Sequence, residues 1–133
     1  MVTIHEEPDC GNAPRKEILR DLVVAIAERD GESIAPLLAD DVAWTFVGEQ
    51  HLTGRDTVLK WVDDLPPVEE VAFGTFLTHG RGAGVDGVLD LVDGARLAFC
   101  HGLRFAGAAR TTKIVSVNSY LIRTTADGGL GAG

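Results

Sequence analysis

Apolar residues in the first part of the chain recur at steps of three and four positions. In residues 14–29 these positions are Ile18, Leu19, Leu22, Val23, Ile26 and Ala27. The spacing predicts an amphipathic helix that begins at Pro14, a residue favoured in the first helical turn, and ends at Asp30-Gly31. We expect Ser33 to cap a short second helix that carries Ile34, Leu37 and Leu38.

A second stretch with helical spacing covers residues 55–65. Its apolar positions are Val58, Leu59, Trp61, Val62 and Leu65, and Pro66-Pro67 follows at once. A proline pair stops a helix, so the pattern predicts a third helix over this range. Between the second and third helices, the β-formers of residues 42–47 (VAWTFV) predict a short strand, and residues 48–54 are expected to be a connector.

The second half of the chain reads as strands. Residues 68–80, 85–92, 95–107 and 111–123 alternate apolar residues with polar or small ones, a pattern typical of strands. Asp93-Gly94, between the second and third of these, is a strong signal for a two-residue hairpin turn. The order helix, helix, strand, helix and four antiparallel strands predicts an α+β fold in which the helices cover one face of a sheet.

The ends of the chain differ in composition from its middle. Residues 1–13 are polar and mixed, and residues 124–133 are rich in glycine. We therefore expect a disordered arm at 1–13, one folded domain at 14–123 and a flexible tail at 124–133. A length of 133 residues also fits one domain.

Charge narrows the range of partners. Twelve Lys+Arg against twenty Asp+Glu give a formal net charge of −8. An acidic surface repels phosphate backbones and anionic lipid headgroups, so we expect neither nucleic acid nor membrane as a partner. The sequence also shows no apolar stretch near the length of a membrane span and no signal peptide, which favours a cytoplasmic protein.

Three segments resemble the NTF2-like superfamily, which includes ketosteroid isomerases, SnoaL-like polyketide cyclases and limonene-epoxide hydrolases. They are RDGESIAPLLADDVAWTFVG, LTGRDTVLKWV and FCHGLRFAGAARTTKIVSVNSYL. The resemblance covers most of residues 14–123. It implies three N-terminal helices packed on a curved, mainly antiparallel β-sheet, which together enclose an apolar cone with catalytic groups pointing into it from the strands.

The catalytic positions of these relatives carry different residues in this chain. The resemblance places the isomerase tyrosine at Leu22, its proton-shuttling aspartate at Phe46 and its second acid at His101. It places the water-holding tyrosine, asparagine and aspartate of the epoxide hydrolases at Trp44, Phe46 and Ser119. An apolar pocket with one histidine is therefore what the resemblance implies.

Strand alternation gives an independent interpretation of His101. A two-residue turn at Asp93-Gly94 would place Asp86 opposite His101, with Val88, Asp90, Leu97, Phe99, Leu103 and Phe105 on the same face. That face is mostly apolar, so it is the expected interior. A carboxylate beside the imidazole would raise the pKa of His101 and allow it to act as a general base or a hydrogen-bond donor. His101, Asp86 and Asp90 are the candidate catalytic residues.

The remaining candidates are ligand-binding side chains: Trp44, Phe46, Trp61, Phe76, Val88, Phe99, Leu103, Val117 and Ser119. They could line a cavity for a small hydrophobic molecule or fill the cone as ordinary core. The histidines and cysteines lack metal-ligand spacing, and no phosphate-binding glycine motif is present, so we expect no metal and no cofactor.

The same register would point Leu89 and Leu91 away from the cone, and an exposed apolar sheet face needs a partner. Together with the resemblance, this predicts a homodimer through the outer face of the sheet. Three interpretations follow: an enzyme that uses acid–base chemistry through His101, a non-catalytic protein that binds a small hydrophobic ligand, and a dimerisation module with a filled core.

Overall fold

The computed structural model describes residues 2–6, 14–107, 109 and 112–124. The elements in chain order are β1 (Thr3–His5), α1 (Pro14–Ala27), α2 (Gly31–Ile34), the 3-10 turn η1 (Ala35–Leu37), β2 (Leu38–Phe46), β3 (Gln50–Thr53), α3 (Arg55–Asp63), β4 (Val68–His79), β5 (Gly82–Leu91), β6 (Arg96–Phe105) and β7 (Ile114–Thr124). The predicted α+β class and most of the predicted elements are confirmed.

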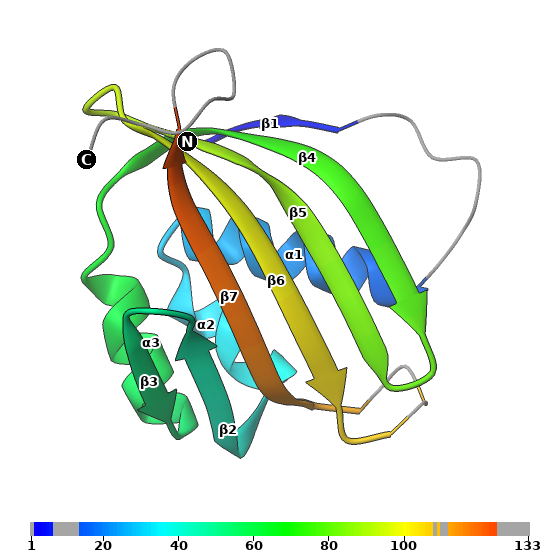
Figure 1. The fold of residues 1–133 in the computed structure, drawn as a ribbon. Coiled ribbons are helices and arrows are strands. Elements are labelled where there is room, and N and C mark those ends of the chain that lie inside the picture. The colour runs from blue at the N-terminus through cyan, green and yellow to red at the C-terminus, as the bar shows by residue number, and fades with distance from the viewer. Residues whose placement is uncertain (1, 7–13, 108, 110–111, 125–133) are drawn as a thin grey trace.

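All the described strands join one sheet. Its order is β1-β4-β5-β6-β7-β2-β3. The pairs β4–β5, β5–β6, β6–β7 and β2–β3 are antiparallel. The pairs β1–β4 and β2–β7 are parallel. The helices lie against one face of this mixed sheet, with α1 crossing behind the long strands and α3 beside β2 and β3 (Figure 1).

Two segments that were expected to be irregular form strands. Residues 3–5, inside the predicted arm, pair with Glu70, Val71 and Ala72 at the edge of β4. Residues 50–53, inside the predicted connector, pair with the end of β2 as a hairpin. Both are short edge strands that their own sequence specifies weakly, because their hydrogen bonds depend on a neighbour far away or across a turn. Residues 7–13 of the arm and 125–133 of the tail lie outside the described residues.

The junction between α1 and α2 uses a different cap from the predicted one. α1 ends at Ala27, and Arg29 takes a left-handed backbone conformation with φ of 55°. Asp30 is the N-cap of α2, and its carboxylate accepts hydrogen bonds from the backbone N–H and the hydroxyl of Ser33. Ser33 is therefore a helical residue that donates to the cap.

The core lies between α1, α3 and the inner face of the sheet. Its largest fully buried side chains include Trp44, Phe46, Phe105, Leu19, Leu22 and Ile34. Leu19, Leu22 and Ile34 come from the helices, Trp44 and Phe46 from β2, and Phe105 from a β6 position predicted to face inwards. Burial of these side chains removes apolar surface from water and holds the two layers together.

The turn between β5 and β6 sets the register of the sheet and corrects the prediction. It has three residues, since Leu91 N–H donates to Ala95 O, and Gly94 has a φ of 94°. Such loops, with glycine in a left-handed conformation, form a common hairpin class. As a result Val85 lies opposite His101 and Asp86 lies opposite Cys100. The predicted register was wrong by one residue, which moves each β5 side chain to the other face.

A bulge in β4 shows what Asp86 does instead. The pairing of β4 with β5 shifts between Phe73 and Phe76. The Asp86 carboxylate accepts a hydrogen bond from the backbone N–H of Thr75 at 2.8 Å, and a Cβ at Gly74 would lie 2.5 Å from that same carboxylate. The aspartate thus satisfies a backbone donor that the irregular pairing leaves without a ladder partner.

Candidate functional site

A pocket lies between α1, α3 and the inner face of the sheet. Its cavity volume is about 70 Å³. Its walls are Val23, Ile26, Ala27, Phe46, Trp61, Leu65, Pro66, Val68, Leu89, Leu91, Leu97, Phe99, His101 and Leu121. Thirteen of these side chains are apolar or aromatic, so among the described residues His101 is the one ionisable group in the lining.

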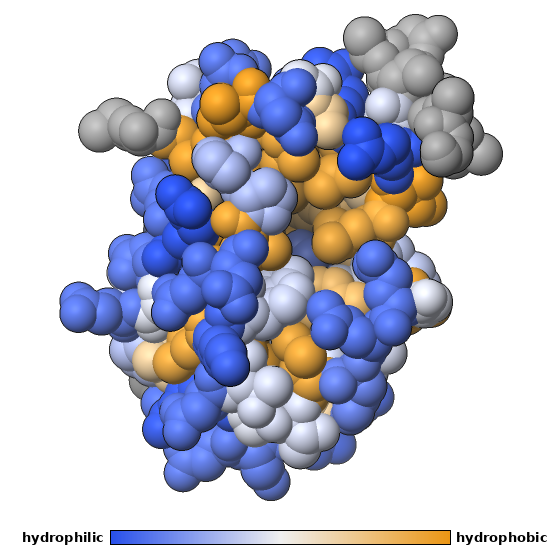
Figure 2. Space-filling model, turned by 90° about the vertical axis from the view of Figure 1, so that its left-hand side faces the viewer, coloured by the Kyte–Doolittle hydropathy of each residue, from blue (hydrophilic) through white to orange (hydrophobic). Residues whose placement is uncertain are grey.

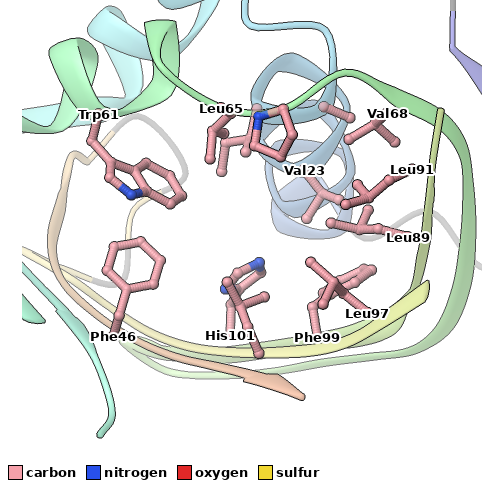
Figure 3. A pocket seen from close by; sticks show the side chains of 14 residues that line it. Val23, Phe46, Trp61, Leu65, Val68, Leu89, Leu91, Leu97, Phe99 and His101 are labelled. Carbon is pink, nitrogen blue, oxygen red and sulfur yellow. The ribbon is translucent and has the colours of Figure 1, made fainter. Parts of the chain in front are cut away.

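Strand alternation places the floor of the pocket. Leu97, Phe99 and His101 are alternate residues of β6 and therefore share one face. Leu89 and Leu91 join them from β5, while Trp61 and Leu65 close the opposite side (Figure 3). Helix α1 contributes the stripe of Val23, Ile26 and Ala27.

The pocket reaches the surface at the segment that joins α3 to β4. Pro66 lines the pocket and is itself exposed. The neighbouring Pro67 carbonyl accepts a hydrogen bond from Val92 N–H at the tip of the β5–β6 hairpin, at 3.0 Å. On the side of the molecule where α3 lies, apolar side chains gather round a hollow in the upper half (Figure 2).

His101 is buried at the floor of this pocket. Its side chain is 6% exposed, and burial lowers its pKa from 6.5 to about 4. The cause is the loss of water around the cation, since no carboxylate in the lining compensates for it. The imidazole is therefore neutral at pH 7, and the predicted rise in its pKa was wrong.

A chain of hydrogen bonds supports the imidazole from behind. Nδ1 of His101 lies 2.6 Å from Oγ of Ser119, and Nε1–H of Trp44 donates to the same Oγ at 2.7 Å. These residues stand on β6, β7 and β2, which are neighbours in the sheet. Ser119 and Trp44 are almost completely buried and lie outside the pocket lining. Ser119 contacts His101 directly behind the lining, while the Trp44 ring also packs against Phe46 and Trp61, with ring centroids 6.0 and 6.3 Å apart.

Aromatic rings fix the imidazole from the sides. Phe99 stacks on it with ring centroids 5.2 Å apart, and Trp44 meets it edge-on at 6.2 Å. The Phe46 and Trp61 rings are tilted against each other, with their centroids 4.3 Å apart. Phe99 in turn lies against Gly87, where an added Cβ would come within 2.3 Å of Ala72 O and 2.8 Å of the Phe99 ring. The floor of the pocket therefore depends on a glycine opposite Phe99.

The two candidate catalytic carboxylates lie away from this site. Asp86 pairs with Cys100 on the outer face, where burial and then the Asp86 charge raise the pKa of the Cys100 thiol. Asp90 pairs with Arg96 and accepts a hydrogen bond from its Nε at 2.6 Å, which lowers the pKa of Asp90. The predicted Asp86–His101 pair was wrong because the hairpin turn has three residues. Asp90 forms an ion pair with Arg96 on the outer face of the sheet.

The structure places only some of the predicted ligand-binding residues in the pocket lining. Phe46, Trp61 and Phe99 line the pocket, as does His101. Trp44 and Ser119 lie behind His101, and Leu103 and Val117 are buried core. Phe76 stacks on Phe73 away from the lining, at a centroid distance of 5.0 Å. Val88 lies on the outer face, so its predicted place in the pocket was wrong.

Several pocket residues were absent from the predicted site. Leu89 and Leu91 were expected to point outwards, but the observed register turns them into the pocket. Val23, Ile26 and Ala27 belong to the stripe already visible in the α1 sequence, and Leu97 shares the face of His101. The helical stripe and the strand alternation could therefore have identified these residues from the sequence. Leu65, Pro66 and Val68 could not be identified in this way, because their place in the lining depends on the path of the linker in three dimensions.

The described residues contain neither a metal centre nor a helix that spans a membrane. No three His, Cys, Asp or Glu side chains in the described part of the chain lie close enough together to hold a metal ion. Over the same residues, none of the helices is both long and apolar enough to cross a membrane. Cys10 lies outside the described residues, and Cys100 is a free, exposed cysteine.

Solved structures of known proteins share this fold. A proposed ketosteroid isomerase from Kribbella flavida DSM 17836 aligns with a TM-score of 0.70 and 21% identity over 90% of this chain and 84% of that chain. An NTF-2 like protein of unknown function from Burkholderia xenovorans LB400 aligns with a TM-score of 0.70 and 14% identity over 81% and 82% of the two chains.

A third structure carries a named activity. The epoxide hydrolase/cyclase-like enzyme SalBIII, described in pyran ring formation in salinomycin, aligns with a TM-score of 0.66 and 15% identity over 88% of this chain and 95% of that chain. No family model matches the sequence, and no curated protein matches it either. The chain therefore has the NTF2-like fold, and at these identities the likeness concerns the fold alone.

Proposed function

We propose that this protein binds a small hydrophobic molecule in the pocket above His101. The observation that carries the proposal is the lining itself: thirteen apolar or aromatic side chains surround one neutral imidazole. Ligand pockets are typically apolar clefts in which a few polar groups fix orientation. The cone between helices and sheet expected from the resemblance is the shape in which such a ligand would be enclosed.

Catalysis by His101 is the second candidate, and one observation favours it: the ring lines the pocket, and Ser119 engages Nδ1, which leaves Nε2 without a hydrogen bond to the described residues. Acid–base catalysis in this pocket would need both a base and an acid, and His101 is the one titratable residue among the described residues of the lining. Asp86 and Asp90 are engaged on the outer face. Acid–base catalysis would therefore require a second proton-transfer group besides His101, whereas ligand binding requires only the lining that the described residues form.

The experiment that tests binding fills the pocket with a side chain. Ala27 lines the pocket from α1 and is buried, so Ala27→Leu adds three carbon atoms there. We expect indane, a bicyclic hydrocarbon, to bind the native protein and to bind Ala27→Leu about tenfold more weakly or worse, a change of about 1.4 kcal/mol. Isothermal titration calorimetry measures both constants.

Ala72→Leu is the matched control, since Ala72 is exposed on β4. It should bind indane as the native protein does, and thermal unfolding should show that both variants are folded. Equal affinity for all three proteins would place the bound indane elsewhere and contradict the proposed site. No binding of indane or of 1-indanone, the ketone of the same size, to the native protein would contradict the proposed function itself.

A further inference from the structure

The three-residue chain Trp44–Ser119–His101 has only one arrangement of protons that satisfies every donor. The indole Nε1–H of Trp44 can only donate, so Ser119 Oγ accepts from it at 2.7 Å. The remaining contact, 2.6 Å long, joins Ser119 Oγ to His101 Nδ1. Either the serine hydroxyl donates to a bare Nδ1, or a protonated Nδ1 donates to the serine.

Burial decides between the two arrangements. Ser119 is 1% exposed, and within the described part of the chain its hydroxyl has no partner except Trp44 and His101. If Nδ1–H donated to Ser119, the hydroxyl proton would be buried without an acceptor, which is costly. When the hydroxyl donates to Nδ1, each polar atom of the chain is satisfied, and the neutral ring carries its proton on Nε2.

The other nitrogen of the ring is the one that a ligand meets. Nε2 makes no hydrogen bond to the described residues, and it is not among their completely enclosed, unpartnered polar atoms. The ring itself lines the pocket, and one of its nitrogens points towards the centre of the space (Figure 3). The pocket therefore presents a single N–H group within apolar walls.

We propose that Ser119, held by Trp44, is a positioning residue that fixes His101 as an Nε2–H donor and thereby makes the pocket select ligands with an oxygen acceptor. The inference rests on the proposed function, because it names the chemistry of the ligand for the same pocket. A carbonyl, ether or epoxide oxygen accepts this N–H. A ligand that offers only an N–H donor meets another donor and gains nothing, and an ammonium ion is excluded by the apolar lining.

Three bicyclic probes of similar size separate these cases: 1-indanone with a carbonyl acceptor, indane with no polar group, and indole with an N–H donor. We expect the native protein to bind 1-indanone about 3- to 10-fold more tightly than indane, the net gain of one hydrogen bond. Indole should gain nothing over indane. In Ser119→Ala the tautomer is no longer fixed, so the ratio of 1-indanone to indole affinity should fall severalfold.

Two further variants make the role of the hydroxyl specific. Ser119→Thr keeps a hydroxyl at the same position and should restore the native ratio, while Ser116→Ala removes a hydroxyl from the same strand without touching His101. Nitrogen-15 NMR of histidine-labelled native protein reads the tautomer directly. It should show a bare Nδ1 and a protonated Nε2 for His101, a signature that a merely structural serine would not set.

The outcomes separate this inference from the proposed function. A protonated Nδ1 in the native protein, or tighter binding of indole than of 1-indanone, would overturn it. Equal binding of indane and 1-indanone would leave a ligand pocket but remove the selection. If none of the probes binds, the proposed function fails, and the nitrogen spectrum alone still decides whether Ser119 fixes the tautomer.

Discussion

At the scale of the residue, the fold holds a histidine where its charged form is unfavourable. Water is excluded on the Ser119 side, and the other side faces hydrocarbon. The pKa of His101 falls to about 4 as a result. A neutral imidazole suits a pocket for uncharged molecules, because a cation there would need a counter-ion that the lining lacks.

The pKa of His101 predicts how stability depends on pH. The folded value of about 4 lies below the ordinary 6.5, so the unfolded chain takes up this proton first as the pH falls. The contribution to stability is complete above pH 6.5 and is lost between pH 6.5 and pH 4, with a total of about 3 kcal/mol. Urea denaturation across this range measures it.

The control for this prediction is His101→Asn, which removes the titrating group. Carboxylates also titrate near pH 4, so the quantity that counts is the difference between the native protein and the variant. We expect that difference in unfolding free energy to shrink as the pH falls from 6.5 to 4. Parallel pH profiles would mean that His101 titrates alike in the folded and unfolded chains, and the buried, neutral imidazole would then be wrong.

Part of the residue-scale picture was available from the sequence. Alternation along β6 places His101 beside Phe99 and Leu103 on an apolar face, and this inward direction is confirmed. The direction of its pKa shift was not available, because it depends on the residue across the strand pair. One extra residue in a turn replaces Asp86 by Val85 at that position.

At the scale of the element, α1 lines the pocket with its C-terminal half and contacts two loops near its N-terminus. Its C-terminal half gives Val23, Ile26 and Ala27 to the pocket. Near its N-terminus, Arg15 is buried and lies over the Phe105 ring at 4.0 Å. The Arg15 guanidinium donates to Gly80 O at 3.0 Å and to Ala109 O at 2.9 Å, in two loops far apart in the sequence.

These contacts predict a specific role for arginine at position 15. Arg15→Lys keeps the charge but loses the planar fork that reaches both loops, so we expect it to lower the unfolding free energy by about 1–3 kcal/mol. Arg104→Lys, an exposed position on β6, should change it by less than about 0.5 kcal/mol. Chemical denaturation of both variants measures the difference.

Arg15→Lys should leave ligand binding unchanged, because the pocket is lined by the C-terminal end of α1 and Arg15 lies at its N-terminal end. An Arg15→Lys protein as stable as Arg104→Lys would show that the helix is not held by these loop contacts. The sequence predicted α1 and its buried stripe correctly, but it gave no sign of this arginine. Its partners are backbone carbonyls in loops 65 and 94 residues away, and carbonyls carry no sequence signal.

Contacts of the turn between β5 and β6 explain why its length was predicted incorrectly. Asp93-Gly94 is typical of a two-residue turn, and the strands on both sides were predicted correctly in kind. The turn includes Val92, whose N–H donates a hydrogen bond to the carbonyl oxygen of Pro67, in another part of the chain. The Asp93 carboxylate also accepts from Ala95 N–H at 2.9 Å, which stabilises the longer loop. Tertiary contacts thus decided a register that local sequence left open.

At the scale of the whole molecule, the order of elements predicted the α+β class, and the resemblance of three segments implied the NTF2-like fold that the solved structures share. The expected homodimer stays a prediction. Leu89 and Leu91 no longer support it, because both line the pocket. The outer face nevertheless exposes Tyr120 and Ile122 beside Cys100, at 46% and 49% exposure for the first two, so apolar surface is available there.

The most direct test of the central claim is an NMR titration of the histidine rings with indane at pH 7. His5, His51 and His79 are exposed and serve as internal controls. Binding in the pocket should shift the ring signals of His101, assigned with His101→Asn, in a saturable way and leave the three exposed histidines unchanged. If the His101 signals stay unmoved at saturating indane, or move only together with the exposed histidines, the pocket above His101 does not bind small hydrophobic molecules.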